Sequence, residues 1–132
     1  MSGTWRWIDF EDIRAIHAAL IARHGGLDGV RDQGAIESAL ARPRNLAAYG
    51  EPDAADLAAA YAFGIARNHG FLDGNKRTAW VVARVFLADN GYGLVFDQAE
   101  GYRLMMSVAE GSTDEVAVGA WFRDRIGPPA SA

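Results

Sequence analysis

One stretch of the chain gathers the residue types that chemistry on a phosphate requires: Asn68-His-Gly-Phe-Leu-Asp-Gly-Asn-Lys-Arg-Thr78. Histidine exchanges a proton near neutral pH, so the His69 imidazole can act as a general base. Asp73 can bind Mg²⁺, which takes one or two carboxylates and completes its shell with water and substrate phosphates. A base and a metal carboxylate this close together are typical of a site that attacks a nucleotide phosphate.

The same stretch also offers groups that can hold the phosphate. A helix is predicted to open near Asn75, and the first N–H groups of a helix have no internal partner and lie at the positive end of its dipole. Gly74 has no side chain, so a phosphate oxygen can approach its backbone closely. Lys76 and Arg77 add two cations in a first turn that would otherwise favour acids. The predicted phosphate-binding residues are Gly74, Asn75, Lys76 and Arg77.

Each residue also has a plainer interpretation. His69 alone fits the C-terminus of a helix, where a cation interacts favourably with the dipole. Asp73 fits a helix N-cap, a role that is compatible with metal binding. Lys76 and Arg77 fit a solvated surface, and Arg67 fits either the surface or a phosphate contact from the preceding helix. The functional interpretation therefore depends on the whole motif.

Two predicted helices flank the motif. Asp53 can cap a helix that runs to about Asn68, and residues 69–74 form a loop between glycines. The helix that opens near Asn75 continues to Asn90-Gly91, which is a C-terminal signal. The loop would therefore present His69 and Asp73 at the N-terminus of a long helix.

The rest of the chain also predicts helices, so the fold class is mostly α. A first helix follows Asp9 and ends at Gly25-Gly26. After a connector, a short helix ends at Pro43, and residues 44–52 are expected to be irregular. Residues 93–96 are expected to form a short extended piece. Two further helices follow, each opened by a capping box: Asp97 with Glu100, and Ser112 with Glu115.

Composition limits the class of protein. The 132 residues are 50% hydrophobic and 23% charged, with a net charge of −4, which fits a single folded domain at 1–126 and a disordered tail at 127–132. With no cysteine, the chain has no disulfide scaffold and no thiolate site. Because the sequence shows neither a long apolar run nor a signal peptide, we expect a cytoplasmic protein without membrane contact.

Charge is concentrated at the motif. The segment from Arg67 to Arg84 contains four basic residues and one acidic residue, although the chain as a whole has a negative net charge. Direct binding to nucleic acid requires a broad basic face, so a small anion is the better match. The stretch is not a Walker A loop, which needs a Ser or Thr directly after the lysine.

The motif resembles a known signature. His69-Gly-Phe-Leu-Asp-Gly-Asn-Lys-Arg77 is similar to the His-x-Phe-x-Asp-Gly-Asn-x-Arg sequence of the Fic/Doc (Fido) superfamily. With lysine at position 76, the motif resembles that of the death-on-curing (Doc) branch, because adenylylating Fic proteins usually have glycine at this position. Residues 30–43 and 58–68 also look Doc-like, and the resemblance covers residues 5–125. It implies a compact Fido-type helical bundle with a small flap, which would be the irregular stretch 44–52 and would dock the target segment.

The resemblance implies a role for each motif residue. His69 would deprotonate a target hydroxyl and Asp73 would bind Mg²⁺. Gly74 and Asn75 would form an anion hole, while Lys76 and Arg77 would hold nucleotide phosphates. Doc proteins are toxins of toxin–antitoxin systems that transfer the γ-phosphate of ATP to a threonine of elongation factor Tu and halt translation. A Phd-like antitoxin encoded beside them holds them inactive. Two alternatives stay open, namely a protein adenylyltransferase and a catalytically weak module that binds the antitoxin.

Three departures qualify the resemblance. Gly70 stands where the family most often has proline, which predicts a looser loop around His69. Trp80 replaces the second arginine of adenylylating Fic proteins, in agreement with the Doc branch, and Arg84 lies about one helical turn further on. The segment Ser107-Val-Ala-Glu-Gly is one residue short of the inhibitory Ser/Thr-x-x-x-Glu-Gly/Asn motif that some Fic proteins carry. Inhibition by a separate protein is the consistent expectation.

Overall fold

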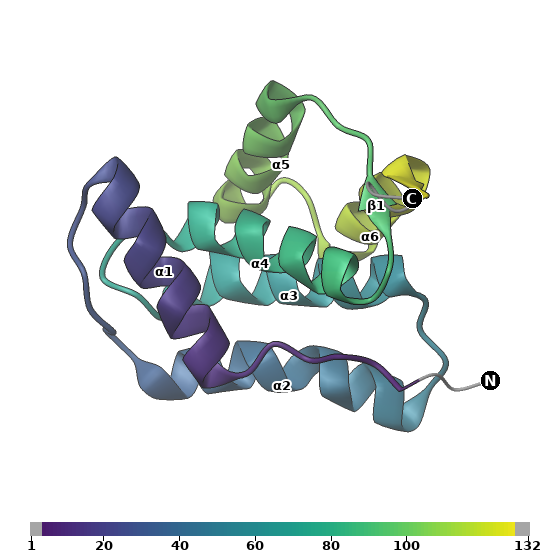
Figure 1. Cartoon of the computed structure of the whole chain (residues 1–132), viewed down its shortest axis with the longest axis horizontal. Helices are drawn as coiled ribbons and strands as arrows, with labels where there is room; N and C mark the ends of the chain where they lie inside the picture. The colour runs from purple at the N-terminus through teal and green to yellow at the C-terminus, as the bar shows by residue number, and fades with distance from the viewer. Residues whose placement is uncertain (1–3, 129–132) are drawn as a thin grey trace.

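The computed structural model describes residues 4–128, which form six helices and two very short strands (Figure 1). The prediction of a mostly α-helical fold is confirmed. In chain order the elements are α1 (Phe10–His24), α2 (Gln33–Tyr49), α3 (Ala54–Asn68), α4 (Asn75–Asp89), β1 (Gly93–Leu94), α5 (Gln98–Glu110), α6 (Glu115–Arg125) and β2 (Ile126–Gly127). None of these helices is long and apolar enough to cross a membrane.

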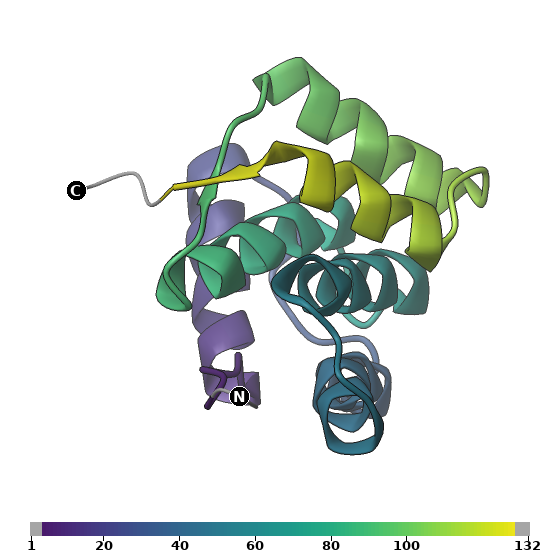
Figure 2. The ribbon, with the colours of Figure 1, turned by 90° about the vertical axis from the view of Figure 1, so that its right-hand side faces the viewer.

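Helix α3 lies at the centre of the fold. It packs against α2 on one side and against α4 and α6 on the others, and Figure 2 shows it enclosed by these helices. Alanine is its main buried residue type, so neighbouring helices can approach it closely on several faces. Gly64 extends this close approach, because a Cβ there would meet the Cβ of Ala39 on α2 at 3.2 Å.

Helix α2 is longer than the sequence predicts. We expected it to end at Pro43 and residues 44–52 to be irregular, but the helix continues through Pro43 to Tyr49. Proline removes one backbone hydrogen bond from a helix interior. Here Pro43 is buried on the face that also carries Ile36 and Leu40, and the burial of this face outweighs the lost bond. The stretch 44–52 is therefore mainly helix, and the prediction that it is irregular is wrong.

The C-terminal part of the chain closes the fold. Strands β1 and β2 pair antiparallel, with Gly93 opposite Gly127, so Gly127 belongs to the sheet and not to the predicted tail. Residues 129–132 of that tail lie outside the described part. Asp97 and Glu100 form the predicted capping box of α5. The expectation that Ser112 caps α6 is wrong, because Asp114 accepts the hydrogen bond from the N–H of Ala117.

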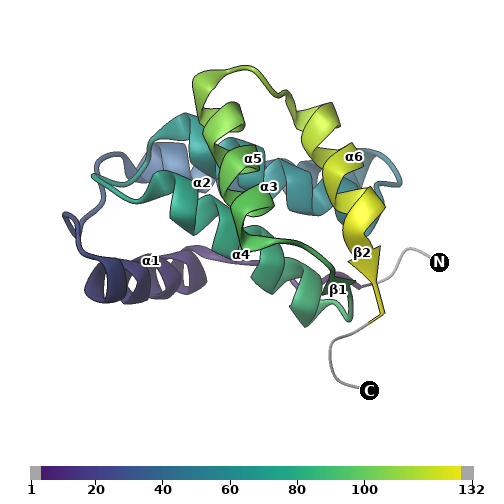
Figure 3. The same ribbon diagram turned by 90° about the horizontal axis from the view of Figure 1, so that it is seen from above.

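Helix α1 crosses one end of the α3–α4 pair, and α5 lies on the opposite side of α4 (Figure 3). Asp9 caps α1 as predicted, and Gly25 ends it. The N-terminus of α4, which begins the predicted phosphate site, faces a cavity that residues of α1, α4 and α5 line.

Candidate active site

The motif loop, residues 69–74, is held by the segment that joins α1 to α2. The backbone N–H groups of Arg31 and Asp32 both donate to the carbonyl oxygen of Gly70, at 2.8 and 3.0 Å. The N–H of Leu72 donates to the carbonyl oxygen of Gly29 at 3.1 Å. Residues 25–32, and not the predicted stretch 44–52, are thus the segment that lies against the motif.

Gly70 packs closely against α2. It is buried, and a Cβ at this position would lie 2.2 Å from Cγ1 of Ile36 on α2. Ile36 is itself 3% exposed, so its side chain fills the space that a larger residue at position 70 would need. Backbone hydrogen bonds and close packing thus hold the loop at Gly70, and the expectation of a looser loop stays a prediction.

Asn75 fixes the other end of the loop. Its side-chain oxygen accepts from the N–H of Phe71 at 3.0 Å, and its side-chain nitrogen donates to the carbonyl oxygen of Phe71, also at 3.0 Å. A side-chain amide carries an acceptor oxygen and a donor nitrogen side by side, so it can pair with both backbone groups of one residue. The Asn75 side chain therefore shapes the loop, and its backbone N–H is the group left to bind an anion at the α4 terminus.

His17 on α1 supports the loop from below. It is 2% exposed, and its Nε2 lies 2.8 Å from the carbonyl oxygen of Asp73. A carbonyl oxygen only accepts, so Nε2 carries the proton. The ring also stacks on Phe71, with centroids 3.8 Å apart and planes 8° apart. No local pattern in the sequence indicates this contact. The available signal was a histidine on the apolar face of α1, because a buried histidine requires a hydrogen-bond partner.

His69 ends α3 in the left-handed conformation, with φ 50° and ψ 47°. It is the one described residue other than glycine with a positive φ, a conformation that costs of order 1 kcal/mol. Its side chain is exposed and has no hydrogen-bond partner in residues 4–128. The prediction that this helix runs to about Asn68 is confirmed, and His69 itself makes the left-handed turn that ends it.

The N-terminus of α4 differs from those of the other described helices. An aspartate caps each of the other five, whereas Gly74 precedes α4 without a side-chain cap, at φ 74°. Its first turn holds Lys76 and Arg77 and no acid. The N–H groups of Asn75, Lys76 and Arg77 therefore remain open, as an anion-binding helix terminus requires.

Asp73 borders this open terminus. Its Oδ1 accepts from the N–H of Gly74 at 2.8 Å, and its Oδ2 accepts from the N–H of Leu27 at 3.3 Å. Gly74 thus donates its N–H to the neighbouring carboxylate, and the open amides begin at Asn75. Each carboxylate oxygen keeps further lone pairs, so Asp73 remains able to bind a cation.

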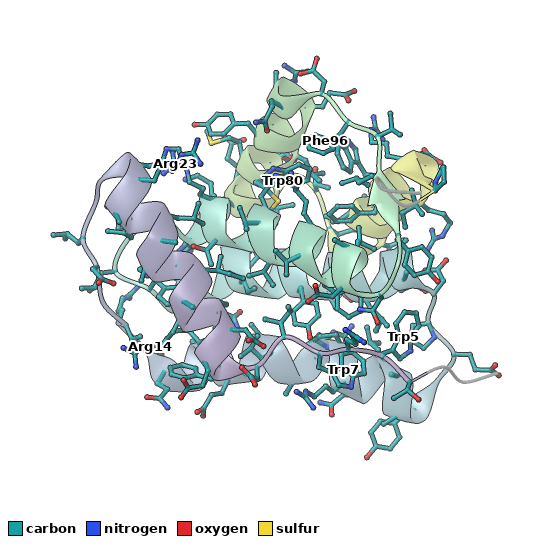
Figure 4. The ribbon with its side chains drawn as sticks, viewed as in Figure 1. Trp5, Trp7, Arg14, Arg23, Trp80 and Phe96 are labelled. Atoms are coloured by element: carbon teal, nitrogen blue, oxygen red, sulfur yellow. The ribbon has the colours of Figure 1, made fainter. Side chains whose placement is uncertain are left out.

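A cavity of about 520 Å³ opens in front of the α4 terminus. Its walls carry Lys76, Arg77 and Arg84 from α4, and Arg23 and His24 from α1, while Asp73 is its only carboxylate. Figure 4 shows Arg23 at the end of α1, with Trp80 between α4 and α5. Such an excess of positive groups favours an anionic ligand. The structure thus brings the predicted residues Asp73 to Arg77 to one cavity, whereas His69 is not among the residues that line it.

Two arginines of the basic stretch have different positions. Arg67 turns away from the cavity, and its Nη1 donates to the carbonyl oxygen of Val108 on α5 at 3.3 Å. Arg84 lines the cavity, and burial lowers the pKa of its guanidinium. Sequence spacing contained this signal, because Arg77 and Arg84 are seven residues apart and share one face of a helix.

Comparison with known proteins gives the same family as the motif. The model of the Fic/DOC family matches residues 7–87. A protein kinase doc of Escherichia phage P1 is 38% identical over 123 residues, which are 92% of this chain and 97% of the relative. A toxin Doc of Mycolicibacterium smegmatis is 41% identical over 119 residues, covering 86% of this chain and 88% of the relative.

Proposed function

Because the chain belongs to the Fic/DOC family, we propose that it is a Doc-type toxin that transfers the γ-phosphate of ATP to a protein hydroxyl. The observation that carries this proposal is the uncapped N-terminus of α4, which opens into a basic cavity. The motif loop that leads into this terminus begins at His69, whose side chain is exposed. The names of the two relatives, a protein kinase and a toxin, support it.

In this proposal α4 holds the phosphates. The open N–H groups of residues 75–77 donate to phosphate oxygens, and the helix dipole adds to their attraction. Lys76 and Arg77 are exposed at the cavity wall, so their side chains can follow the phosphate chain. The hydrogen bonds of Asn75 and His17 hold the loop, so these donors would be in place before the ligand arrives.

Asp73 would hold Mg²⁺ together with the phosphates. The donor set fits this ion, which is commonly bound through one or two carboxylates and through substrate phosphates. Among residues 4–128 no group of three or more histidines or acids could bind a metal without the substrate. When bound, the ion would neutralise charge on the phosphate oxygens.

His69 would act as the general base. The target hydroxyl oxygen forms a bond to the γ-phosphorus, the bond from that phosphorus to the bridging oxygen breaks, and ADP leaves. The hydroxyl proton passes to the neutral imidazole. The exposed position of His69 on its αL turn gives a folded target protein access to it. The proposed target is a threonine of elongation factor Tu or a similar factor, and a Phd-like antitoxin is the proposed inhibitor.

Growth arrest tests these roles. His69→Ala should abolish the arrest that expression of the wild-type chain causes, while the fold is retained. Tyr49→Ala is the matched control, because Tyr49 is 91% exposed at the end of α2 and should leave toxicity unchanged. Undiminished toxicity of His69→Ala would remove His69 from the mechanism.

A second variant addresses Asp73. Asp73→Asn retains an oxygen that can accept from the N–H of Gly74 but removes the charge. It should weaken Mg²⁺-dependent binding of ATP, measured by calorimetry with and without the ion. An unchanged dependence on Mg²⁺ would contradict the metal assignment.

A further inference from the structure

The cavity continues beyond the proposed phosphate site, along one face of α4. Arg77, Trp80, Val81 and Arg84 all line it. Spacings of three, four and seven residues place side chains on the same side of a helix. Arg84 therefore lies two turns, or roughly 10 Å, beyond Arg77 along the helix axis.

Two aromatic rings support the Arg84 guanidinium. Its central carbon lies 4.7 Å from the ring centroid of Phe96 and 5.5 Å from that of Trp80. The two rings meet edge to face at 5.2 Å, and Trp80 is only 8% exposed. A guanidinium that stacks on aromatic faces keeps the N–H groups at its edge free to donate. Arg84 is thus oriented before any ligand binds.

Apart from the two rings, Arg84 has no ion-pair or hydrogen-bond partner in the described part of the chain. The arginines that form ion pairs there are Arg42, Arg123 and Arg125. Burial of Arg84 disfavours its charged form, as the lowered pKa shows. A charge that is partly removed from water and lacks a partner is costly. A ligand that offers acceptor atoms would compensate for this cost.

The position of Arg84 indicates which part of a nucleotide it would meet. Phosphates held at the first turn of α4 leave roughly two helical turns of cavity before Arg84. Gln98 and Tyr102 of α5 line the same cavity and add polar groups. Its volume of about 520 Å³ falls within the usual range for small-molecule sites. The space next to Arg84 therefore suits the ribose and base.

We propose that Arg84, supported by Trp80 and Phe96, donates hydrogen bonds to the nucleoside half of the bound nucleotide and sets its affinity. The inference rests on the proposed nucleotide-dependent function. Arginine carries only donors, so Arg84 contacts oxygen or nitrogen acceptors of the ribose or base. It is a binding residue and takes no part in the transfer of the phosphoryl group.

Calorimetric titration of the full chain with Mg²⁺ tests this inference through two ligands, ATP and inorganic tripolyphosphate. The variant Arg84→Met removes the donors and the charge but retains a long side chain over the aromatic rings. It should weaken ATP binding about tenfold, as expected for one lost charge-assisted hydrogen bond. Tripolyphosphate has no nucleoside and should bind the variant and the wild-type chain equally.

Arg103→Met is the matched control, because Arg103 is an exposed cation of α5 that does not line the cavity. It should change neither affinity. Arg84→Lys is the second variant. It retains the charge but not the planar donors, so it should also lose ATP affinity while tripolyphosphate binding is unchanged.

Three results would overturn the inference. These are unchanged ATP affinity in both Arg84 variants, equal weakening of ATP and tripolyphosphate, and a wild-type chain that binds ATP no more tightly than tripolyphosphate. Because these are binding measurements, they distinguish failure of this inference from failure of the proposed phosphoryl transfer. A chain that binds ATP through Arg84 but modifies no protein would contradict only the phosphoryl transfer.

Discussion

Close packing between Gly70 and Ile36 predicts a specific energetic coupling. In Gly70→Ala the new Cβ would lie 2.2 Å from Cγ1 of Ile36, whereas carbon atoms normally approach to about 3.5–4.0 Å. The side chain of Ile36 or the loop must therefore move by more than about 1 Å. Overpacking of this kind lowers the free energy of unfolding by about 1–3 kcal/mol. The alanine also reduces the conformational freedom of the unfolded chain, which raises the free energy of unfolding by about 0.4–1 kcal/mol. We expect a net loss of about 1–2 kcal/mol in the free energy of unfolding.

A second substitution isolates the contact. Ile36→Ala alone should cost about 2–5 kcal/mol, because it removes a buried side chain. In the double variant the clash no longer exists. Its loss in the free energy of unfolding should therefore be about 1–2 kcal/mol smaller than the sum of the two single losses. Urea denaturation of the four proteins gives the coupling. Additivity within about 0.5 kcal/mol would refute the view that packing against Ile36 holds the loop at Gly70.

Three further predictions concern the core and the surface. His17→Leu leaves the carbonyl of Asp73 without its partner at 2.8 Å and should lower the free energy of unfolding by about 1–3 kcal/mol in urea. Burial raises the pKa of Tyr61 to about 12, so ultraviolet titration should show a phenol that stays protonated at pH 11, and ordinary titration near 10 would contradict this. Arg123, bonded to the carboxylate, lowers the pKa of Asp53 from 3.8 to about 2, and the depressed pKa stabilises the fold above pH 3.8. Arg123→Met should be less stable than the wild type by about 0.5–1 kcal/mol at neutral pH, because this pair is exposed. The difference should shrink as the pH falls through about 2, and a difference that stays undiminished below this pH would contradict the cause given.

Local signals predicted most of the helices. Aspartates at Asp9, Asp53 and Asp97 cap helices where the sequence predicted, because a cap depends on residues only three positions apart. The same reasoning failed at Pro43, where packing against α3 keeps the helix intact. A burial energy contributed by distant residues is not visible in local spacing.

The candidate site was predicted in part. The residues Asp73 to Arg77 meet at one cavity because they are consecutive and begin one helix. The supports of the loop, His17 and Ile36, come from other helices, so no local pattern could assign them. The position of the segment 25–32 against the loop likewise depends on how α1 crosses α4, which only the tertiary structure shows.

The most direct test of the account is the mass of elongation factor Tu after incubation with the purified chain, ATP and Mg²⁺. We expect an increase by one phosphoryl group, located on a threonine and absent when His69→Ala replaces the wild-type chain. An increase by one adenylyl group, or an unchanged mass, would contradict the proposed transfer of a phosphoryl group to this factor.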